Sequence, residues 1–304
     1  MDEISSGLVR TLSFFDAYDY PPTRAELFYT WDRGADNGRA VTQNDLATGF
    51  VRLETDGIIA ETRGRITFSG RTALVADHEK RAALFPFKIR QARRIVRWLV
   101  RLSGVRFVAL CNTTALEHAK APGDLDFFII AKRGSLWQTR FFSVLPFKFF
   151  NRRPRAGQEM NTACFSFFID DEQLDLSGLQ LAGDDVYFRH WFLSLLPLYD
   201  DGISVSFWEA NQSLLARHPM ALPWIPSHDL CVPQAHLRIP MLSSLERIAK
   251  RIQTRYFPES IRALMNQDTR VQVNDHVLKF HVNDGREAYR SRYYERCTDH
   301  AVSP

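Results

Sequence analysis

Several features are scarce in this 304-residue sequence, and each scarcity narrows the range of folds. The four cysteines form no CxxC pair, which argues against a zinc site and against a disulfide framework. No apolar run reaches the ~20 residues that would span a bilayer. The opening stretch "MDEISSGLVR" lacks the basic and apolar segments of a secretory signal, so we expect a cytoplasmic protein without membrane insertion.

Acidic residues are absent between Lys80 and Arg106, a stretch that holds nine Lys or Arg. After Pro86, apolar residues recur at helical spacing, which predicts a long basic amphipathic helix over 79–104. The apolar stripe of this helix consists of Ile89, Ala92, Val96 and Leu99. Its charged side is either a solvated face, the default interpretation, or a surface that attracts phosphate beside the central site.

Residues 1–78 follow the order of a winged-helix module. Three segments have helical spacing, the second with a capping box from Thr23 to Glu26, and two short strands flank Arg63-Gly64. The third helix carries one Arg against several acids, which is a poor match to phosphate. We therefore favour a packing or protein-interaction role for this module over DNA binding.

The remaining sequence predicts an α+β chain. Residues 105–182 alternate three strands, "VRFVALC", "LDFFIIAK" and "ACFSFFID", with helices, which indicates a mixed-sheet core. Residues 183–304 are expected to be mainly helical, ending in the strand "VLKFHV" and a basic helix. The apolar helices expected there are Tyr187–Leu198, Ser206–Leu215 and Leu245–Ile252.

The chemistry is concentrated in "ALCNTTALEHAKAPGDLDFFII". In a strand, residues two apart point to the same face, so Asp124 and Asp126 are expected to project together. Paired carboxylates repel unless a cation or a proton lies between them, and Mg²⁺ with a triphosphate is a common solution. The turn "CNTT" precedes a short helix and is placed to offer backbone N–H groups to phosphate. The alternative is a solvated turn, which suits Asp124 better than Asp126.

The segment resembles the core motif of the DNA polymerase beta-like nucleotidyltransferases, where a Gly-Ser turn, a helix and a strand opening with Asp-x-Asp follow one another. It is more specifically similar to bacterial predicted nucleotidyltransferases with an N-terminal winged helix. The likeness extends from about Leu8 to Arg296. Its most recognisable parts are "FFDAYDYP", "DLDFFIIAKRGSLWQTR" and a late "LKFH…D".

The resemblance implies that Asp124 and Asp126 hold Mg²⁺, with an NTP as the substrate. Asn112 and Thr113 stand where the family has Gly-Ser and are expected at the phosphates. Asn tolerates the backbone conformations of Gly better than most residues, and Thr retains the hydroxyl of Ser.

The third carboxylate of the family has one candidate, Asp170, at the end of "CFSFFID". Lys132 and Arg140 are candidate phosphate contacts, although each is equally explained as a surface or packing residue. His276 and His281 lie near Asp275 and Asp284, and a metal cluster there is an open alternative.

The function implied by the resemblance is transfer of a nucleotidyl group from an NTP to an unknown acceptor. Two alternatives stay open. The first is a catalytically inactive descendant of this fold that serves as a binding or scaffold protein. The second is a winged-helix DNA-binding regulator, for which the basic stretch from Lys80 to Arg106 would be the supporting feature.

Overall fold

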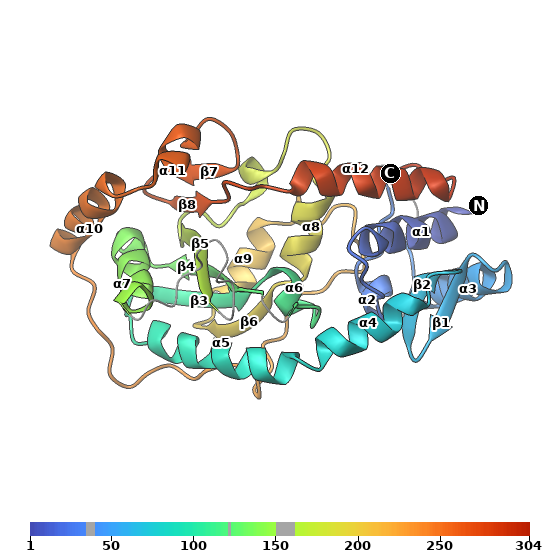
Figure 1. Cartoon of the computed structure of the whole chain (residues 1–304), viewed down its shortest axis with the longest axis horizontal. Helices are drawn as coiled ribbons and strands as arrows, with labels where there is room; N and C mark the ends of the chain where they lie inside the picture. Colours follow the sequence, from blue (N-terminus) through green and yellow to red (C-terminus); the bar gives the residue numbers. More distant parts are fainter. Residues whose placement is uncertain (35–39, 121–122, 150–161) are drawn as a thin grey trace.

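The protein has a mixed α+β fold, seen in a computed structural model that describes residues 1–34, 40–120, 123–149 and 162–304. Helices and a small hairpin from the N-terminal part occupy one end of the molecule (Figure 1). A six-stranded sheet with its covering helices occupies the other end. In the described ranges, no helix has the length and apolar character needed to cross a membrane.

The N-terminal unit, here the described residues up to Phe68, consists of three helices followed by an antiparallel hairpin, in the predicted order. Its elements are α1 (Glu3–Asp16), α2 (Arg24–Tyr29), α3 (Gln43–Thr55), β1 (Ile59–Thr62) and β2 (Arg65–Phe68). The predicted capping box is confirmed, because Thr23 and Glu26 each bond the other's backbone N–H. Arg63 and Gly64 both have positive φ, which matches the twist of a tight hairpin turn.

The C-terminal helix α12 (Arg286–Asp299) belongs to the core of this N-terminal unit. It lies beside α1 at the end of the molecule (Figure 1). Tyr293 and Cys297 of α12 are buried in the same apolar cluster as Leu8 and Leu12 of α1. The two ends of the chain therefore share one core.

Gly7 marks a close approach within that core. A Cβ at this position would overlap the indole ring of Trp31 and would lie 2.8 Å from the carbonyl oxygen of Asp32. Trp31 is fully buried, and its indole N–H donates a hydrogen bond of 3.2 Å to the carbonyl of Ile4. The ring therefore packs directly on α1, where it is anchored by this hydrogen bond.

Gly7→Ala is expected to lower the free energy of unfolding by about 1–3 kcal/mol, although Ala is the better helix former. Urea unfolding of the purified variant measures the change. Gly178→Ala is the matched control, because no atom lies within 4 Å of a Cβ there, and it should stay within ~0.5 kcal/mol of wild type. Identical stability of all three proteins would contradict the close packing of Gly7 on Trp31.

Two helices connect the N-terminal unit to the sheet, α4 (Ala73–Ala82) and α5 (Phe85–Leu99). The single helix predicted over 79–104 is thus in two pieces, because the chain turns before Pro86 opens the first turn of α5. The predicted apolar stripe of α5 is confirmed as buried. Lys88 is buried with it, which the stripe did not predict.

The sheet has the strand order β6-β3-β4-β5-β8-β7. Its strands are β3 (Val105–Leu110), β4 (Leu125–Ala131), β5 (Ala163–Asp170), β6 (Leu196–Asp200), β7 (Val271–Val273) and β8 (Val277–Phe280). β4 and β5 are parallel, and every other neighbouring pair is antiparallel. The strand β8, from the far end of the chain, thus lies between β5 and the edge strand β7.

Helices cover both faces of this sheet. The elements around it are α6 (Asn112–Ala115), α7 (Leu136–Phe149), a 3-10 turn (Ser177–Leu179), α8 (Val186–Leu193), α9 (Ser204–Ala210), α10 (Ser243–Arg255) and α11 (Glu259–Leu264). Phe127 of β4 packs in the cluster that contains α5, α7 and α10. Phe128 packs in the cluster that contains α8 and α9. By alternation along the strand, Asp126 shares the α8 face with Phe128.

Two predicted helices in the C-terminal part extend too far, and the one expected over Ser206–Leu215 ends at Ala210. The helix expected over Tyr187–Leu198 ends at Leu193, and Leu196–Asp200 forms the edge strand β6 beside β3. Pro197 is tolerated there because an edge strand has an unpaired side. The strand β7 is absent from the sequence prediction, since three residues are too short a run to show alternation.

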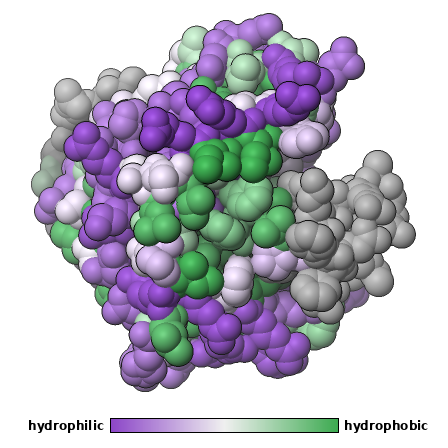
Figure 2. Space-filling model, turned by 90° about the vertical axis from the view of Figure 1, so that its left-hand side faces the viewer, coloured by the Kyte–Doolittle hydropathy of each residue, from purple (hydrophilic) through white to green (hydrophobic). Residues whose placement is uncertain are grey.

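The end of the molecule that carries α7 and α10 shows apolar side chains among hydrophilic ones (Figure 2). Leu245, Ile248 and Ile252 recur along one side of α10 and are exposed, as is Leu242 just before the helix. Ala249, on the adjoining side of α10, packs in the core of the sheet. The apolar surface of α10 therefore extends from the core onto the exposed side of the helix.

Candidate functional site

Asp124 and Asp126 lie at the start of β4 and line one cavity of about 640 Å³. Asn112, at the beginning of α6, lines it with them. The three residues meet because β3 ends beside the start of β4, where the N–H of Cys111 donates to the carbonyl oxygen of Asp126 at 3.1 Å. The structure thus brings together the carboxylate pair and the polar turn that the sequence singled out.

Asn112 adopts a backbone conformation that is more typical of glycine. Its φ is 59°, in the left-handed region that Asn tolerates. Its side-chain amide donates to Asp126 Oδ2 at 2.9 Å, while its Oδ1 accepts from the hydroxyl of Tyr187 at 3.1 Å. Asn112 therefore links Tyr187 on α8 to the Asp126 carboxylate.

Both carboxylates are oriented by neighbours. Oδ1 of Asp124 accepts a hydrogen bond from the hydroxyl of Thr162, just before β5. Lys88 reaches from α5 to the same corner and donates to the carbonyl of Gly123. Together with the bond from Asn112 on α6, these contacts reach the start of β4 from three parts of the chain and hold it in place.

Burial controls the charges here. It raises the pKa of Asp126, with a further rise from Asp124, while the Asn112 amide and Lys88 oppose it. Burial lowers the pKa of Lys88, and the two carboxylates oppose that shift. Asp126 is thus costly to ionise, and a cation between the two carboxylates would relieve both their repulsion and the burial cost of Asp126.

The next strand supplies no acid to the cavity. Cys164 of β5 lies opposite Asp126 in the parallel register, and burial raises its pKa to about 12. Ser166 follows on the same face and is hydrogen-bonded to Nε2 of His281 at 3.1 Å. Burial lowers the pKa of His281 to about 3, so its imidazole is neutral at pH 7.

The far wall of the cavity is formed by β8 and by the segment that follows it. It contributes Lys279 and Arg286, both buried, together with Asp284. Lys279 Nζ lies 3.7 Å from Asp284, and Arg286 binds the same carboxylate at 2.8 Å. Burial lowers the pKa of Lys279 to about 8. The cations on this wall are therefore largely neutralised by the acid beside them.

Four predicted site residues do not line this cavity, namely Asp170, Lys132, Arg140 and Thr113. Asp170 pairs with Ala131 in the β4–β5 register, at the opposite end of the strand from Asp126. It is therefore not the third carboxylate of the site. Lys132 follows that same far end of β4. Arg140 is buried against α10 and β8, where it donates to Gln253 Oε1 at 2.6 Å and stacks over Phe280.

Thr113, the fourth predicted phosphate contact, is exposed and lines a different cavity. That cavity is apolar, has a volume of about 400 Å³, and shares Asn112, Tyr187, Trp191 and Tyr289 with the carboxylate cavity. Asn112 therefore lines both adjoining cavities, whereas Thr113 lines the apolar one.

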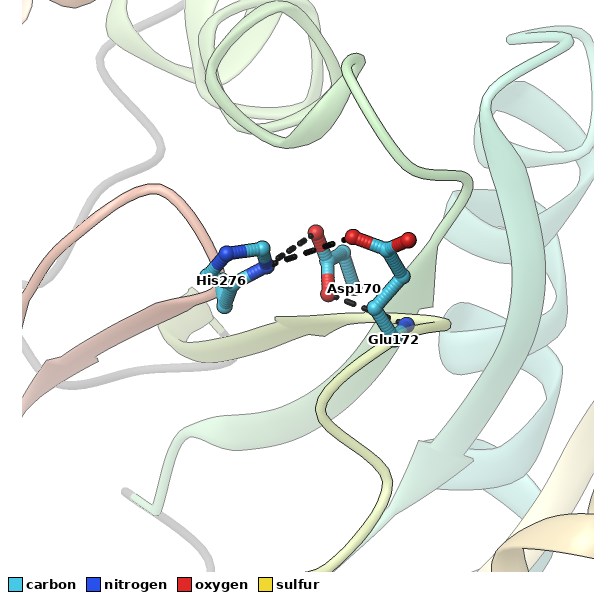
Figure 3. A group of neighbouring side chains, drawn as sticks. All are labelled: Asp170, Glu172 and His276. Carbon is cyan, nitrogen blue, oxygen red and sulfur yellow. Dashed lines mark hydrogen bonds and ion pairs between the residues drawn. The ribbon is translucent and has the colours of Figure 1, made fainter.

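Asp170 belongs instead to a second cluster, with Glu172 and His276 (Figure 3). His276 Nδ1 lies 2.9 Å from Asp170 Oδ2 and 4.0 Å from Glu172 Oε2. The ligand atoms lie within 4.8 Å of one another, the spacing of a metal site. However, Asp170 also accepts the backbone N–H groups of Glu172 and Gln173, and Arg133 binds Glu172 at 2.6 Å. These contacts explain the cluster without an ion.

The sequence grouped His276 and His281 as one alternative metal cluster, and the structure separates them. His281 and Asp284 line the carboxylate cavity, whereas His276 and Asp275 line a hollow near α10. The sequence did not single out Lys88, Ser166 or Arg286 as residues of this site. For the wall that contains Lys279 and Arg286, the one sequence signal was the late "LKFH…D" of the resemblance.

Comparison of the chain with protein-family models, with curated proteins and with solved structures found no match in any of the three.

Proposed function

We propose that this chain is a nucleotidyltransferase-like protein that binds an NTP with Mg²⁺ and transfers a nucleotidyl group to an acceptor. One observation above all supports the proposal. Asp124, Asp126 and Asn112 line a single cavity large enough for a nucleotide, in the arrangement expected from the resemblance.

The residues present fit Mg²⁺. Carboxylate oxygens are its preferred protein ligands, and it is usually held by one or two of them plus phosphate oxygens and water. Asp124 and Asp126 are oriented by hydrogen bonds from Thr162 and Asn112, and Asp126 is also hydrogen-bonded by the Cys164 thiol. When bound, Mg²⁺ would stabilise the charge that develops on the phosphate oxygens during in-line displacement.

The other residues then have defined roles. Asn112 is a positioning residue, because its amide is committed to Asp126 and Tyr187. Lys88 lies among the carboxylates as a fixed positive charge. Ser166, held by neutral His281, is the polar group on β5 nearest in register to the carboxylate pair.

A second candidate function is nucleotide binding without transfer. It is favoured by Cys164, which stands on β5 opposite Asp126, and by the distant placement of Asp170. Among the described residues that line the cavity, the third carboxylate is Asp284, which is paired with Lys279 and Arg286 and so is poorly suited to accept the proton of an acceptor hydroxyl. Pyrophosphate release in the presence of candidate acceptors separates transfer from binding alone.

We also infer that the N-terminal unit is a winged-helix-like module with a packing role. The packing of α12 against α1 supports this inference. The single Arg of α3, Arg52, is paired with Asp2, and Asp45 and Glu54 lie on the same helix. An electrophoretic shift of arbitrary duplex DNA that weakens with salt would favour a DNA-binding regulator instead.

The proposed function predicts a Mg²⁺-dependent rise in melting temperature with at least one NTP. A ligand that binds the folded state alone stabilises it by about 2.7 kcal/mol at one hundred times its dissociation constant. Asp126→Asn should abolish the rise while leaving the unliganded protein at least as stable, because burial raises the pKa of Asp126 and so disfavours its charge.

Differential scanning fluorimetry with four NTPs, each with and without Mg²⁺, makes the measurement. Asp229→Asn is the matched control, since Asp229 is exposed in a loop far along the chain, and it should respond as wild type does. No rise with any NTP at millimolar concentration would count against both nucleotide functions.

A further inference from the structure

The apolar cavity that adjoins the carboxylate cavity has the chemistry of a binding site. It lies where α1 and α2 of the N-terminal unit meet α6 and α8 of the sheet unit, so its wall is built from both units. Aromatic rings dominate this wall, including those of Phe14, Tyr29, Tyr187 and Trp191. Aromatic walls favour a flat ring as the occupant.

Charge narrows the class of ligand. None of the described residues that line this cavity is Lys or Arg, so a phosphate or carboxylate group would find no counter-charge. Glu26 is the one acid in the lining, and its carboxylate already accepts hydrogen bonds from Thr23 and Arg65. An uncharged molecule is therefore the best match.

The wall contains two buried polar atoms without a hydrogen-bond partner among the described residues, the Tyr18 hydroxyl and one nitrogen of His190. Nε2 of His190 makes no hydrogen bond, although only 4% of this residue is exposed. The ring is fixed in place, because it stacks on Phe14 at a centroid distance of 3.7 Å. Burial lowers the pKa of His190 well below its ordinary value, so the ring is neutral and has one hydrogen bond to give or to take. A buried polar atom left without a partner is costly, and a ligand hydroxyl would satisfy it.

The two cavities are connected. Tyr187 and Asn112 line both, and the Tyr187 hydroxyl bonds the amide that orients Asp126. Tyr289 lines both as well and stacks on Tyr18 at 4.2 Å. An occupant of the apolar cavity would thus touch the residues that position the carboxylates.

We propose that this cavity binds a planar, uncharged aromatic molecule bearing a hydroxyl group, and that this molecule is the acceptor. The acceptor role rests on the function proposed above. In the transfer, the acceptor oxygen forms a bond to the α-phosphorus of the NTP. The bond from that phosphorus to the bridging oxygen breaks, pyrophosphate leaves with the electron pair, and the hydroxyl proton passes to water.

The test uses 2-naphthol as the probe on the full chain, without NTP or Mg²⁺, measured by isothermal titration calorimetry. Wild type is expected to bind with a dissociation constant on the order of 100 µM. Naphthalene, which lacks the hydroxyl, should bind about fivefold more weakly, and 2-naphthoate should not bind. Absence of 2-naphthol binding at 2 mM, or tighter binding of the naphthoate anion, would overturn the proposal.

Two variants locate the binding. Leu196→Trp fills the cavity from the edge strand β6 and should weaken 2-naphthol at least tenfold, whereas Val51→Trp adds the same ring to the exposed side of α3 and should change nothing. His190→Phe keeps the stacked ring and should reduce the preference for 2-naphthol over naphthalene to less than twofold. Unchanged binding in both cavity variants would refute this location, and His190→Phe decides alone if Leu196→Trp does not fold.

The acceptor role is tested by adding both ligands. Simultaneous binding of 2-naphthol and the NTP supports it. Competition between them would overturn it, because the cavity would then hold the nucleobase. Failure of every NTP to bind, with 2-naphthol binding intact, would count against the proposed function and leave the aromatic site standing.

Discussion

Acidification from pH 7 to pH 5 is expected to lower the free energy of unfolding by about 2 kcal/mol through His218 alone. This side chain is buried, and its Nδ1 lies 2.9 Å from the carbonyl oxygen of Thr30. Burial lowers the pKa of His218 to about 4; Asp32 opposes the shift and Arg189 adds to it. The folded protein therefore keeps this imidazole neutral at pH 5.

The sign follows from which state binds more protons. In the unfolded chain a histidine has a pKa near 6.5, whereas His218 in the folded protein takes up its proton only near pH 4. Between these values the unfolded state binds the additional proton. Stability is thus fully present above about pH 7, falls as the pH drops through 6.5, and stops falling near pH 4.

A second acid-sensitive contact joins α4 to the turn after α6. His78 and His118 are buried with their Nδ1 atoms 3.0 Å apart, so one ring donates and the other accepts. Burial lowers the pKa of His78 to about 4 and that of His118 to about 3, and Arg81 beside them lowers both further. Protonation of either ring would place a second positive charge beside Arg81, so this pair adds to the loss at low pH.

Urea denaturation at pH 7, 6 and 5 measures the effect. His218→Gln keeps an N–H donor for Thr30 and removes the titrating group, so it should reduce the loss between pH 7 and pH 5 by about 2 kcal/mol. His228→Gln is the matched control, because His228 is fully exposed, and its curve should follow that of wild type. A wild-type stability that is constant from pH 7 to pH 5 would disprove the claim that these buried histidines stay neutral in the folded protein.

Arg286→Met is expected to destabilise the protein by about 3–5 kcal/mol, which lowers the melting temperature by roughly 10 °C. The guanidinium is buried at the start of α12 and binds two buried carboxylates, Asp185 at 2.7 Å and Asp284 at 2.8 Å. It also donates to the carbonyl of Leu179 and the hydroxyl of Thr269. Methionine would leave Asp185 buried without its ion-pair partner and Asp284 with Lys279 alone, 3.7 Å away.

The damage should extend to the N-terminus of α8. Asp185 caps that helix by accepting the N–H of Phe188, and Arg286 is its buried ion-pair partner. Thermal unfolding followed by circular dichroism gives the size of the loss. Arg292→Met makes the same exchange at an exposed position of α12 and should stay within ~0.5 kcal/mol of wild type. A loss at Arg286 as small as that control would mean that the two acids find other partners.

The sequence predicted the local part of the candidate site and not its long-range part. Alternation along one strand was enough to place Asp124 and Asp126 on one face, and the turn at Asn112 was near because β3 and β4 are neighbours. Alternation does not measure distance along a strand. Asp170 lies level with Ala131, a full strand length from Asp126, because that position depends on the register of β5 against β4.

The far wall of the carboxylate cavity could not be predicted from alternation for a different reason. It comes from β8, which pairs with β5 across more than one hundred residues of sequence. No periodicity within either strand specifies that pairing, and the buried ion pairs of Arg286 exist only once it has formed. In the same way, the residues around Pro197 have the pattern of an apolar helix, and only their pairing with β3 makes them a strand.

The shared core of α1 and α12 has a consequence for synthesis on the ribosome. Tyr293 and Cys297, which close the core of the N-terminal unit, are made more than two hundred residues after Phe68. At 5–20 residues per second, the interval is roughly 10–40 s. For that time the side of α1 that later meets α12 faces water. The helix α1 therefore reaches its final surroundings only after the whole sheet unit and α12 have been made.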